Sequence, residues 1–385
     1  MMPQFGIEQY KLSEVDLTLL WSSIFLLLTG MVMVYSSSIA VAEASRFTGN
    51  NPAYYLVRHS IFMAVGFVAA GIVFQVPLRI WQKISPFLFL MGLILLVLVL
   101  VPGIGREVKG ASRWISLRIV NVQPSEFMKL LVVLYTADFT VRKMEHLHNL
   151  KTFLPLAAVM VLVSALLLKQ PDFGAFVIIA AMTAGILFLG GIRPRLFAML
   201  ISILIVAFTV LIAISPYRRD RIFGFMDPWA DSFGSGYQLT QALIAFSRGE
   251  WFGVGLGASI GKLFYLPEAH TDFILAVLAE ELGFIGVATV IVLFALIVHR
   301  AFAIGRQCVI LDRIYAALVA QGIGIWIGLQ SLINMGVNMG WLPTKGLTLP
   351  LMSFGGSGIV ANCVALAILL RIDWENRQLM RGAEV

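Results

Sequence analysis

The sequence predicts an all-α, polytopic integral membrane protein with about ten transmembrane helices and a large extracytoplasmic loop between the seventh and the eighth. The chain has 385 residues, of which 59% are hydrophobic and only 13% are charged. An ordinary soluble domain is nearer half apolar and a quarter charged. The mean hydropathy is +0.90, and long apolar stretches recur along the whole chain. These observations exclude a disordered protein, a disulfide scaffold and a typical cytosolic enzyme.

The predicted spans are apolar stretches of about 20 residues, the length that crosses a bilayer as a helix. They are Leu17–Tyr35, Ser60–Leu78, Ile84–Ile104, Pro124–Val141, Phe153–Leu168, Phe173–Ile192, Leu196–Ser215, Phe273–Val298, Ile314–Met339 and Thr348–Leu370. The charged residues inside them are Glu126, Lys129, Asp138, Glu280 and Glu281. Charge at membrane depth is costly, so these five residues require an explanation.

The distribution of basic residues predicts the orientation. An even number of spans places both termini on one side, and short cytoplasmic loops carry excess Lys and Arg. With cytoplasmic tails at residues 1–16 and 372–385, the inner segments hold Lys11, Arg79, Lys83, Arg142, Lys143, Lys151, Arg193, Arg195, Arg300, Arg306, Arg313, Arg371, Arg377 and Arg381. The short outer connections hold only Arg46, Arg58, Lys169 and Lys345. The whole chain, 1–385, is expected to form one membrane domain.

Two outer loops do not follow this pattern. Gly105–Gln123 carries Arg106, Lys109, Arg113 and Arg118 against Glu107 alone, and the loop at residues 216–272 is too long for a simple connection. Positive charge on the outer side does not serve topology. It indicates an outward-facing site for an anionic ligand rather than for nucleic acid.

The fourth predicted span contains an acid and a base near its start. Ser125 and Pro124 mark a helix start, and Glu126 and Lys129 lie three residues apart on one face. This pair is typical of a functional group facing a wet cavity. It is equally typical of an ion pair that holds helices together, and the residues alone leave both readings open.

Three further places carry candidate chemistry, each beside a simpler reading. Asp172 marks an outer junction but lies in a turn with Pro171. Asp272, at the mouth of the eighth span, is a candidate reactive group but also a candidate helix N-cap. The Arg218–Arg221 cluster suits either phosphate or lipid headgroups.

The remaining motifs exclude a nucleotide site and a zinc site, and they predict local structure. The glycine run Gly253–Gly261 lacks a preceding strand and the Walker pattern, so it predicts a tight turn rather than a nucleotide site. His270 and Glu268 do not make a zinc set. Leu239–Phe246 is predicted as a short amphipathic helix. The helix breakers in Pro343–Gly358 predict irregular backbone at membrane depth, which lines a cavity or is buried in protein.

Several motifs together resemble the SEDS family (shape, elongation, division and sporulation), and its division branch more than its elongation branch. The resemblance runs from about Asp16 to Glu375. It is carried by GASRWI, QPSEFMKL, KQPDFG, LPEAHTDFILA and PTKGLTLPLMSFGGSG, at Gly110–Ile115, Gln123–Leu130, Lys169–Gly174, Leu266–Ala276 and Pro343–Gly358. The PTKGLTLP stretch indicates the division branch.

The resemblance implies a peptidoglycan glycosyltransferase that polymerises lipid II in the bacterial inner membrane, at the division septum. Asp272 would be the catalytic residue. The partners implied are a class B penicillin-binding protein and other divisome proteins. The residues that we expect to bind substrate are Arg113, Trp114, Glu126, Lys129, Asp172, Arg218, Arg219 and Lys345. No cofactor is definite, and a divalent cation, Mg²⁺ or Mn²⁺, is the one candidate.

The hypothesis for the chemistry is general base catalysis by Asp272 on the acceptor hydroxyl. Basic residues would stabilise the departing lipid pyrophosphate, with Lys129, Arg113 and the Arg218–Arg221 cluster as candidates. Glu126 would then position Lys129. The alternatives are a lipid II flippase, for which Asp138 is the inner-half candidate, an elongation polymerase of the same family, and a non-catalytic scaffold.

Overall fold

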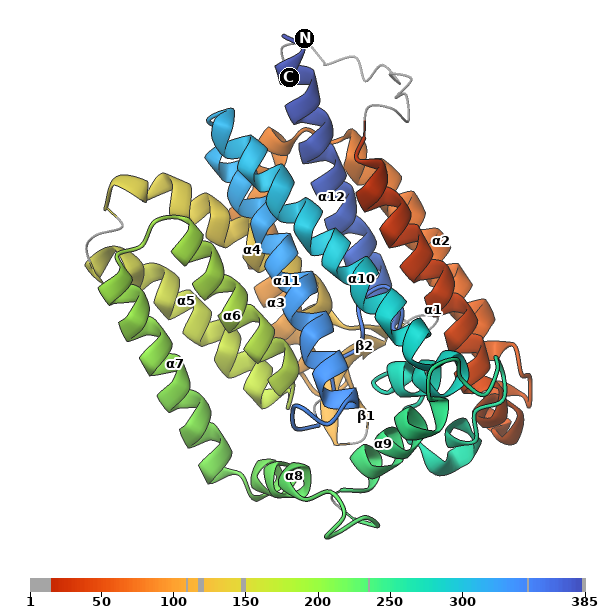
Figure 1. Ribbon diagram of the computed structural model, residues 1–385. Coiled ribbons are helices and arrows are strands. Elements are labelled where there is room, and N and C mark those ends of the chain that lie inside the picture. The colour runs from red at the N-terminus through yellow and green to blue at the C-terminus, as the bar shows by residue number, and fades with distance from the viewer. Residues whose placement is uncertain are drawn as a thin grey trace.

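The computed structural model describes residues 15–108, 110–116, 121–146, 150–234, 236–344 and 346–382. Long helices run side by side along one direction, and α12 finishes at the end of the bundle where α1 starts (Figure 1). The long helices are α1 (Leu17–Ala44), α2 (Tyr54–Gln75), α3 (Leu78–Val99), α4 (Pro124–Arg142), α5 (Leu150–Lys169), α6 (Phe173–Leu189), α7 (Pro194–Ile214), α10 (Ile274–Ile310), α11 (Ile314–Asn338) and α12 (Gly356–Met380).

The predicted all-α polytopic class is confirmed. Within the described residues, eight helices are long and apolar enough to cross a membrane. Of the other two predicted spans, α6 has 17 residues, and α4 carries Glu126, Lys129 and Asp138. The total of ten spans stays a prediction.

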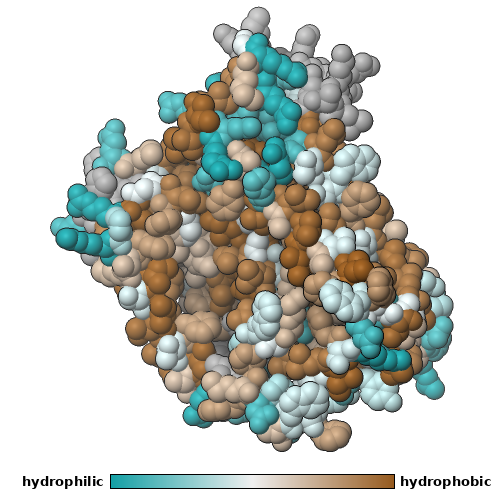
Figure 2. Space-filling model, viewed as in Figure 1, coloured by the Kyte–Doolittle hydropathy of each residue, from teal (hydrophilic) through white to brown (hydrophobic). Residues whose placement is uncertain are grey.

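The helices differ in how much protein covers them. In their most apolar stretches, 78% of the residues of α12 and 72% of those of α11 are buried, whereas α7 has no buried residue. A helix that is apolar all round and uncovered by protein is suited to contact with lipid. Figure 2 shows apolar residues across the middle of one face and hydrophilic residues gathered where α12 finishes. The core is therefore built around α11 and α12, with α7 at the edge.

The connections predicted to lie outside contain more regular structure than the sequence indicated. The loop after α3 forms a three-stranded antiparallel sheet, β1 (Gly105–Val108), β2 (Ala111–Ser116) and β3 (Asn121–Val122), in the order β1-β2-β3. The long loop contains α8 (Pro216–Met226) and α9 (Tyr237–Gly249), and α9 includes the predicted amphipathic helix Leu239–Phe246. Short helical turns lie at Arg46–Thr48, Met144–His146 and Gly261–Tyr265.

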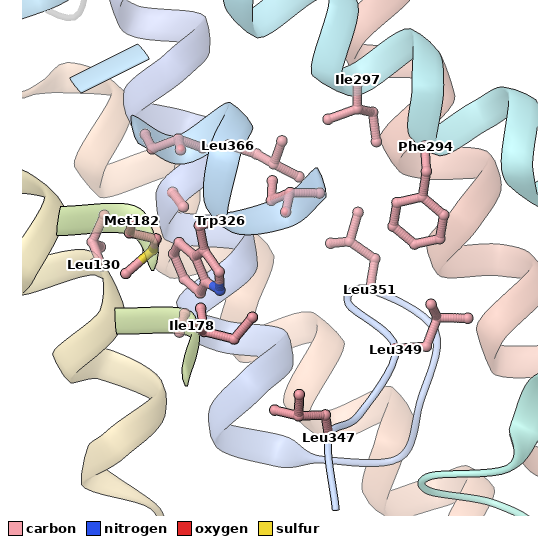
Figure 3. Close-up of a cluster of buried hydrophobic side chains, with 14 of the residues drawn as sticks. Leu130, Ile178, Met182, Phe294, Ile297, Trp326, Leu347, Leu349, Leu351 and Leu366 are labelled. Atoms are coloured by element: carbon pink, nitrogen blue, oxygen red, sulfur yellow. The ribbon is translucent and has the colours of Figure 1, made fainter. Parts of the chain in front are cut away.

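The segment between α11 and α12 is irregular and enters the core. The predicted span began at Thr348, but α12 begins only at Gly356, so that boundary was wrong. Leu347, Leu349 and Leu351 are buried on this non-helical chain (Figure 3). Its polar backbone is satisfied by protein, because Gln330 Nε2 donates to the Thr348 carbonyl at 2.9 Å. Residues 339–355 are called the re-entrant segment below.

Candidate functional site

Asp272 lies in the turn just before α10, and its backbone is fixed by α11. The Asp272 carbonyl accepts hydrogen bonds from Asn334 Nδ2 at 2.9 Å and from Asn338 Nδ2 at 3.0 Å. The N-cap residue of α10 is Phe273, and Asn338 Oδ1 accepts from the Ala276 N–H at 3.2 Å. Asp272 is therefore not the N-cap residue that the simpler reading allowed.

The re-entrant segment packs directly against the Asp272 turn. Ser353 Oγ donates to the Thr271 carbonyl at 2.6 Å, and the Phe354 N–H donates to the His270 carbonyl at 3.0 Å. Because these bonds fix the two residues that precede Asp272, the turn and the re-entrant segment are joined directly.

Arg113 of β2 reaches the same place as Asp272. A Cβ added at Gly346 would lie 3.5 Å from Asp272 Oδ2 and 3.8 Å from Arg113 Nη1. The guanidinium of Arg113 also donates through Nε to the Gln170 carbonyl at 3.4 Å and through Nη2 to the Pro171 carbonyl. The sheet, the α5–α6 turn and the re-entrant segment thus bring an acid and a base to one glycine. A side chain at position 346 would begin in van der Waals contact with both groups.

Asp172 has the turn role that its neighbours indicated. It is the N-cap of α6, because Oδ1 accepts from the Ala175 N–H at 3.2 Å. Its Oδ2 accepts from Ser125 Oγ at 2.8 Å and from Gln123 Nε2 at 3.4 Å. The buried Asp172 carboxylate therefore ties the start of α6 to the start of α4, and the structure shows a structural role for it.

Glu126 and Lys129 form a buried ion pair. Lys129 Nζ lies 2.9 Å from Glu126 Oε1 and 2.7 Å from Gln330 Oε1, and it sits 5.3 Å from the centre of the Trp326 ring. The Lys129 side chain is fully buried. The ion pair that the sequence allowed is present within α4, and the hydrogen bond from Lys129 to Gln330 joins α4 to α11. A phosphate could contact Lys129 only after the pair had opened.

The other predicted substrate-binding residues are described in part. Trp114 is half-buried on β2, opposite Arg106. Arg219 is exposed on α8, while Arg221 Nη1 donates to the Thr344 carbonyl at 3.1 Å and ties α8 to the re-entrant segment. Arg218 lies in α8, but its side chain is outside the described residues, as is the whole of Lys345.

Sequence reasoning missed the amides that build this site. Gln330, Asn334 and Asn338 are buried and spaced four residues apart on α11, so they lie on one face. Polar residues at helical spacing inside an apolar span were the signal that could have found them.

The glutamates of α10 belong to a separate network. Ser36 Oγ donates to Glu281 at 2.7 Å, and Lys262 Nζ lies 2.8 Å from Glu281. Glu280 pairs with Arg248 at 2.8 Å. These contacts fix the glycine-rich loop against α1 and α10, and Gly253, Gly255 and Gly257 adopt positive φ, as the predicted tight turn requires. The two glutamates that the sequence left unexplained within the eighth predicted span therefore make structural contacts.

Known proteins resemble the whole chain. Residues 17–378 match the FtsW/RodA/SpoVE family, described as cell cycle protein. The chain belongs to the FtsW/RodA/SpoVE family. A relative from Aromatoleum aromaticum, described as a probable peptidoglycan glycosyltransferase FtsW, is 65% identical over 97% of this chain and 91% of its own. A relative from Burkholderia thailandensis with the same description is 56% identical over 97% of this chain and 82% of its own.

Solved structures of the family have the same fold. A peptidoglycan synthase complex, described as coordinating polymerization and crosslinking, contains a chain with a TM-score of 0.75 and 28% identity over 94% of this chain and 98% of that one. The rod shape determining protein RodA of Thermus thermophilus gives a TM-score of 0.67 and 27% identity over 93% of this chain and 96% of that one. The predicted membership of this family, and the multi-pass membrane fold, are therefore confirmed.

Proposed function

We propose that this FtsW/RodA/SpoVE family member polymerises lipid II into glycan strands for septal wall synthesis, with Asp272 as the general base. The chain is a peptidoglycan glycosyltransferase, as its relatives' descriptions indicate. The observation that carries the catalytic assignment is that Asp272 Oδ2 and Arg113 Nη1 both lie within 4 Å of a Cβ built at Gly346. A carboxylate near a guanidinium suits a reaction in which the carboxylate removes a proton and the cation stabilises a departing phosphate.

The proposed step is a displacement at the anomeric carbon of the donor sugar. Asp272 takes the proton of the acceptor hydroxyl, whose oxygen forms the new bond to that carbon. The bond from the carbon to the pyrophosphate oxygen breaks, and the lipid pyrophosphate leaves with the electron pair. Because the pyrophosphate is a stable anion, no second carboxylic acid is needed to protonate it.

Among the basic candidates, Arg113 is best placed to stabilise the departing pyrophosphate. A guanidinium binds phosphate through two parallel N–H groups. Lys129 is buried in its pair with Glu126, and Arg219 is exposed on α8. We therefore assign Arg113 to the leaving group and Lys129 to positioning of the re-entrant segment, through Gln330 and the Thr348 carbonyl.

A divalent cation would supply further charge neutralisation on the pyrophosphate. Among the described residues, no group of three or more His, Cys, Asp or Glu side chains could hold a metal ion. A Mg²⁺ ion that accompanies substrate phosphates needs only one or two carboxylates from the protein. The proposed displacement does not depend on such an ion.

Partner and location follow from the family. The similar fold in a peptidoglycan synthase complex supports a class B penicillin-binding protein as partner. The relatives described as FtsW support a role at the septum with other divisome proteins. The concentration of basic residues on the inner loops supports cytoplasmic termini in the inner membrane.

The test is polymerisation of lipid II by the purified protein with its transpeptidase. Asp272→Asn and Asp272→Ala should each abolish strand formation, because neither side chain accepts the proton. Asp227→Asn is a matched control in the same outer loop, since Asp227 is exposed on the short turn before Ala230. Full activity of Asp272→Asn would refute the general base.

The same preparation tests the flippase alternative. Its inner-half candidate, Asp138, is buried and pairs with Arg142 at 2.7 Å, as a structural contact would. Transbilayer movement of labelled lipid II by liposomes that contain Asp272→Ala protein, without polymerisation, would favour the flippase.

A further inference from the structure

A cavity of about 760 Å³ lies between the end of α4 and the start of α5. Since α4 has 19 residues and begins beside the Asp272 site, this cavity is roughly 27 Å away from that site along the helix. The residues that line it are Val141, Arg142, Lys143, Met144, Glu145, Lys151, Thr152 and Pro155.

The lining is basic, and one of its cations is held in place. Arg142 Nη2 lies 2.7 Å from Asp138 Oδ2, yet 54% of the Arg142 side chain stays exposed. The Asp138 carboxylate is itself buried and accepts from Gln82 Nε2 at 3.3 Å. A guanidinium has five N–H donors, so one carboxylate contact leaves most of them for another anion. Lys143 and Lys151 are exposed at the same cavity, against the single carboxylate of Glu145.

The other walls are aliphatic and adjoin the apolar outer surface of α5. Val141, Met144 and Pro155 line the cavity, and Leu154, beside Pro155, is 61% exposed. The apolar stretch of α5 is only 22% buried by protein. The cavity is therefore next to a helix surface that the bilayer covers.

The start of α7 brings two more basic residues near the cavity. Phe153 of α5 packs in one cluster with Ile192 and Phe197, which bring the start of α7 beside the α4–α5 connection (Figure 1). Arg193 and Arg195 are exposed within this stretch. Orientation of the chain requires basic residues on the inner loops, but it does not require them around a cavity with aliphatic walls.

We propose that this cavity binds the phosphate headgroup of an anionic phospholipid, whose acyl chains lie along α5. Basic pockets between transmembrane helices on the cytoplasmic side suit anionic headgroups. The phosphate would contact Arg142, Lys143 and Lys151, and the glycerol and first methylenes would contact Met144 and Pro155. The site does not depend on glycosyl transfer. A soluble phosphate compound offers the same charge without the chains, so the experiment separates the two sources.

The test counts bound lipid by native mass spectrometry of the full chain in a non-ionic detergent, titrated with phosphatidylglycerol or phosphatidylcholine. The wild-type protein should retain more phosphatidylglycerol than phosphatidylcholine. Lys143→Gln/Lys151→Gln should weaken this binding by about 25-fold, since one surface cation contributes roughly five-fold. Lys143→Arg/Lys151→Arg should restore it, and Glu145→Gln should strengthen it by roughly five-fold because it removes the carboxylate.

The matched control is Arg79→Gln/Lys83→Gln, which removes two exposed inner cations from α3, outside this cavity. It should retain phosphatidylglycerol like wild type. Equal loss in this control, or no loss in the Lys143/Lys151 variant, would overturn the proposal. Equally tight binding of sn-glycerol 3-phosphate or inorganic phosphate would overturn it as well, and would assign the cavity to a soluble ligand.

Discussion

Two buried asparagines of α11 determine where Asp272 lies. Asn334 and Asn338 donate to the same Asp272 carbonyl, and Asn334 also donates to the Leu347 carbonyl at 2.6 Å. The backbone of the reactive turn and that of the re-entrant segment are therefore fixed by one helix. A site fixed in this way needs little rearrangement when charge develops during the reaction.

Arg113 should matter for rate more than for folding. Arg113→Ala removes the guanidinium beside Asp272, and we expect the polymerisation rate to fall by about 100-fold or more. Arg113→Lys should recover only part of it, because an ammonium lacks the planar fork. The control is Arg106→Ala, because Arg106 is an exposed arginine of the neighbouring strand β1. Equal losses in a lipid II assay would argue against a specific role for Arg113.

Lys129 should matter for stability. Lys129→Met leaves the buried Glu126 carboxylate without its cation, and the expected loss in unfolding free energy is about 3–5 kcal/mol. Glu126→Gln should cost a similar amount for the reciprocal reason. The double variant Glu126→Gln/Lys129→Met should recover most of the loss. Unfolding in detergent measures the stability of all three variants. If the two single losses simply add in the double variant, Glu126 and Lys129 do not stabilise each other.

At the scale of elements, the site depends on how closely α1 approaches the re-entrant segment. A Cβ at Gly30 of α1 would lie 2.5 Å from Met352 Cα and 2.7 Å from the Met352 carbonyl oxygen. These are backbone atoms, so they cannot move aside as a side chain would. Helix α1 thus packs directly against the backbone of the segment that contacts the Asp272 turn.

Gly30→Ala should therefore displace the re-entrant segment. We expect a loss of about 1–3 kcal/mol in stability, as for other overpacked sites, together with reduced polymerisation. Gly71→Ala on α2 has nothing within 4 Å of its added Cβ and should be neutral or slightly stabilising. Thermal unfolding of the two purified variants compares them directly. Equal melting temperatures would show that the close approach is not required.

At the scale of the whole molecule, we expect charge on the connections to determine which face of the bundle is outside. Both native cysteines, Cys308 and Cys363, are buried, so an introduced cysteine can report its side of the membrane. With Cys308→Ser and Cys363→Ser as background, Asp227→Cys should react with a membrane-impermeant maleimide on intact spheroplasts. Arg306→Cys should react only after the membrane is opened. The reverse pattern would invert the proposed topology.

The sequence alone determined the helical spans and the residues that depart from them. Hydrocarbon tolerates no unsatisfied backbone, so a long apolar stretch such as the predicted span Leu196–Ser215 becomes a helix in any arrangement of its neighbours, as α7 does. The same cost made Glu126, Lys129 and Asp138 visible as exceptions before any contact was known. Motifs in sequence order located Asp272 and Arg113, but did not show that they meet.

Only the tertiary structure decided which residues share a site and where the irregular segment ends. Lys129 and Gln330 are 201 positions apart, and Asn338 lies 66 positions from the carbonyl that it holds. Periodicity reports which face of a helix is polar, but not which distant segment covers that face. The helix breakers of Pro343–Gly358 predicted irregular backbone here, but not that α12 would start at Gly356 rather than Thr348. The amides that satisfy the non-helical backbone before it come from α11, and local sequence carries no record of them.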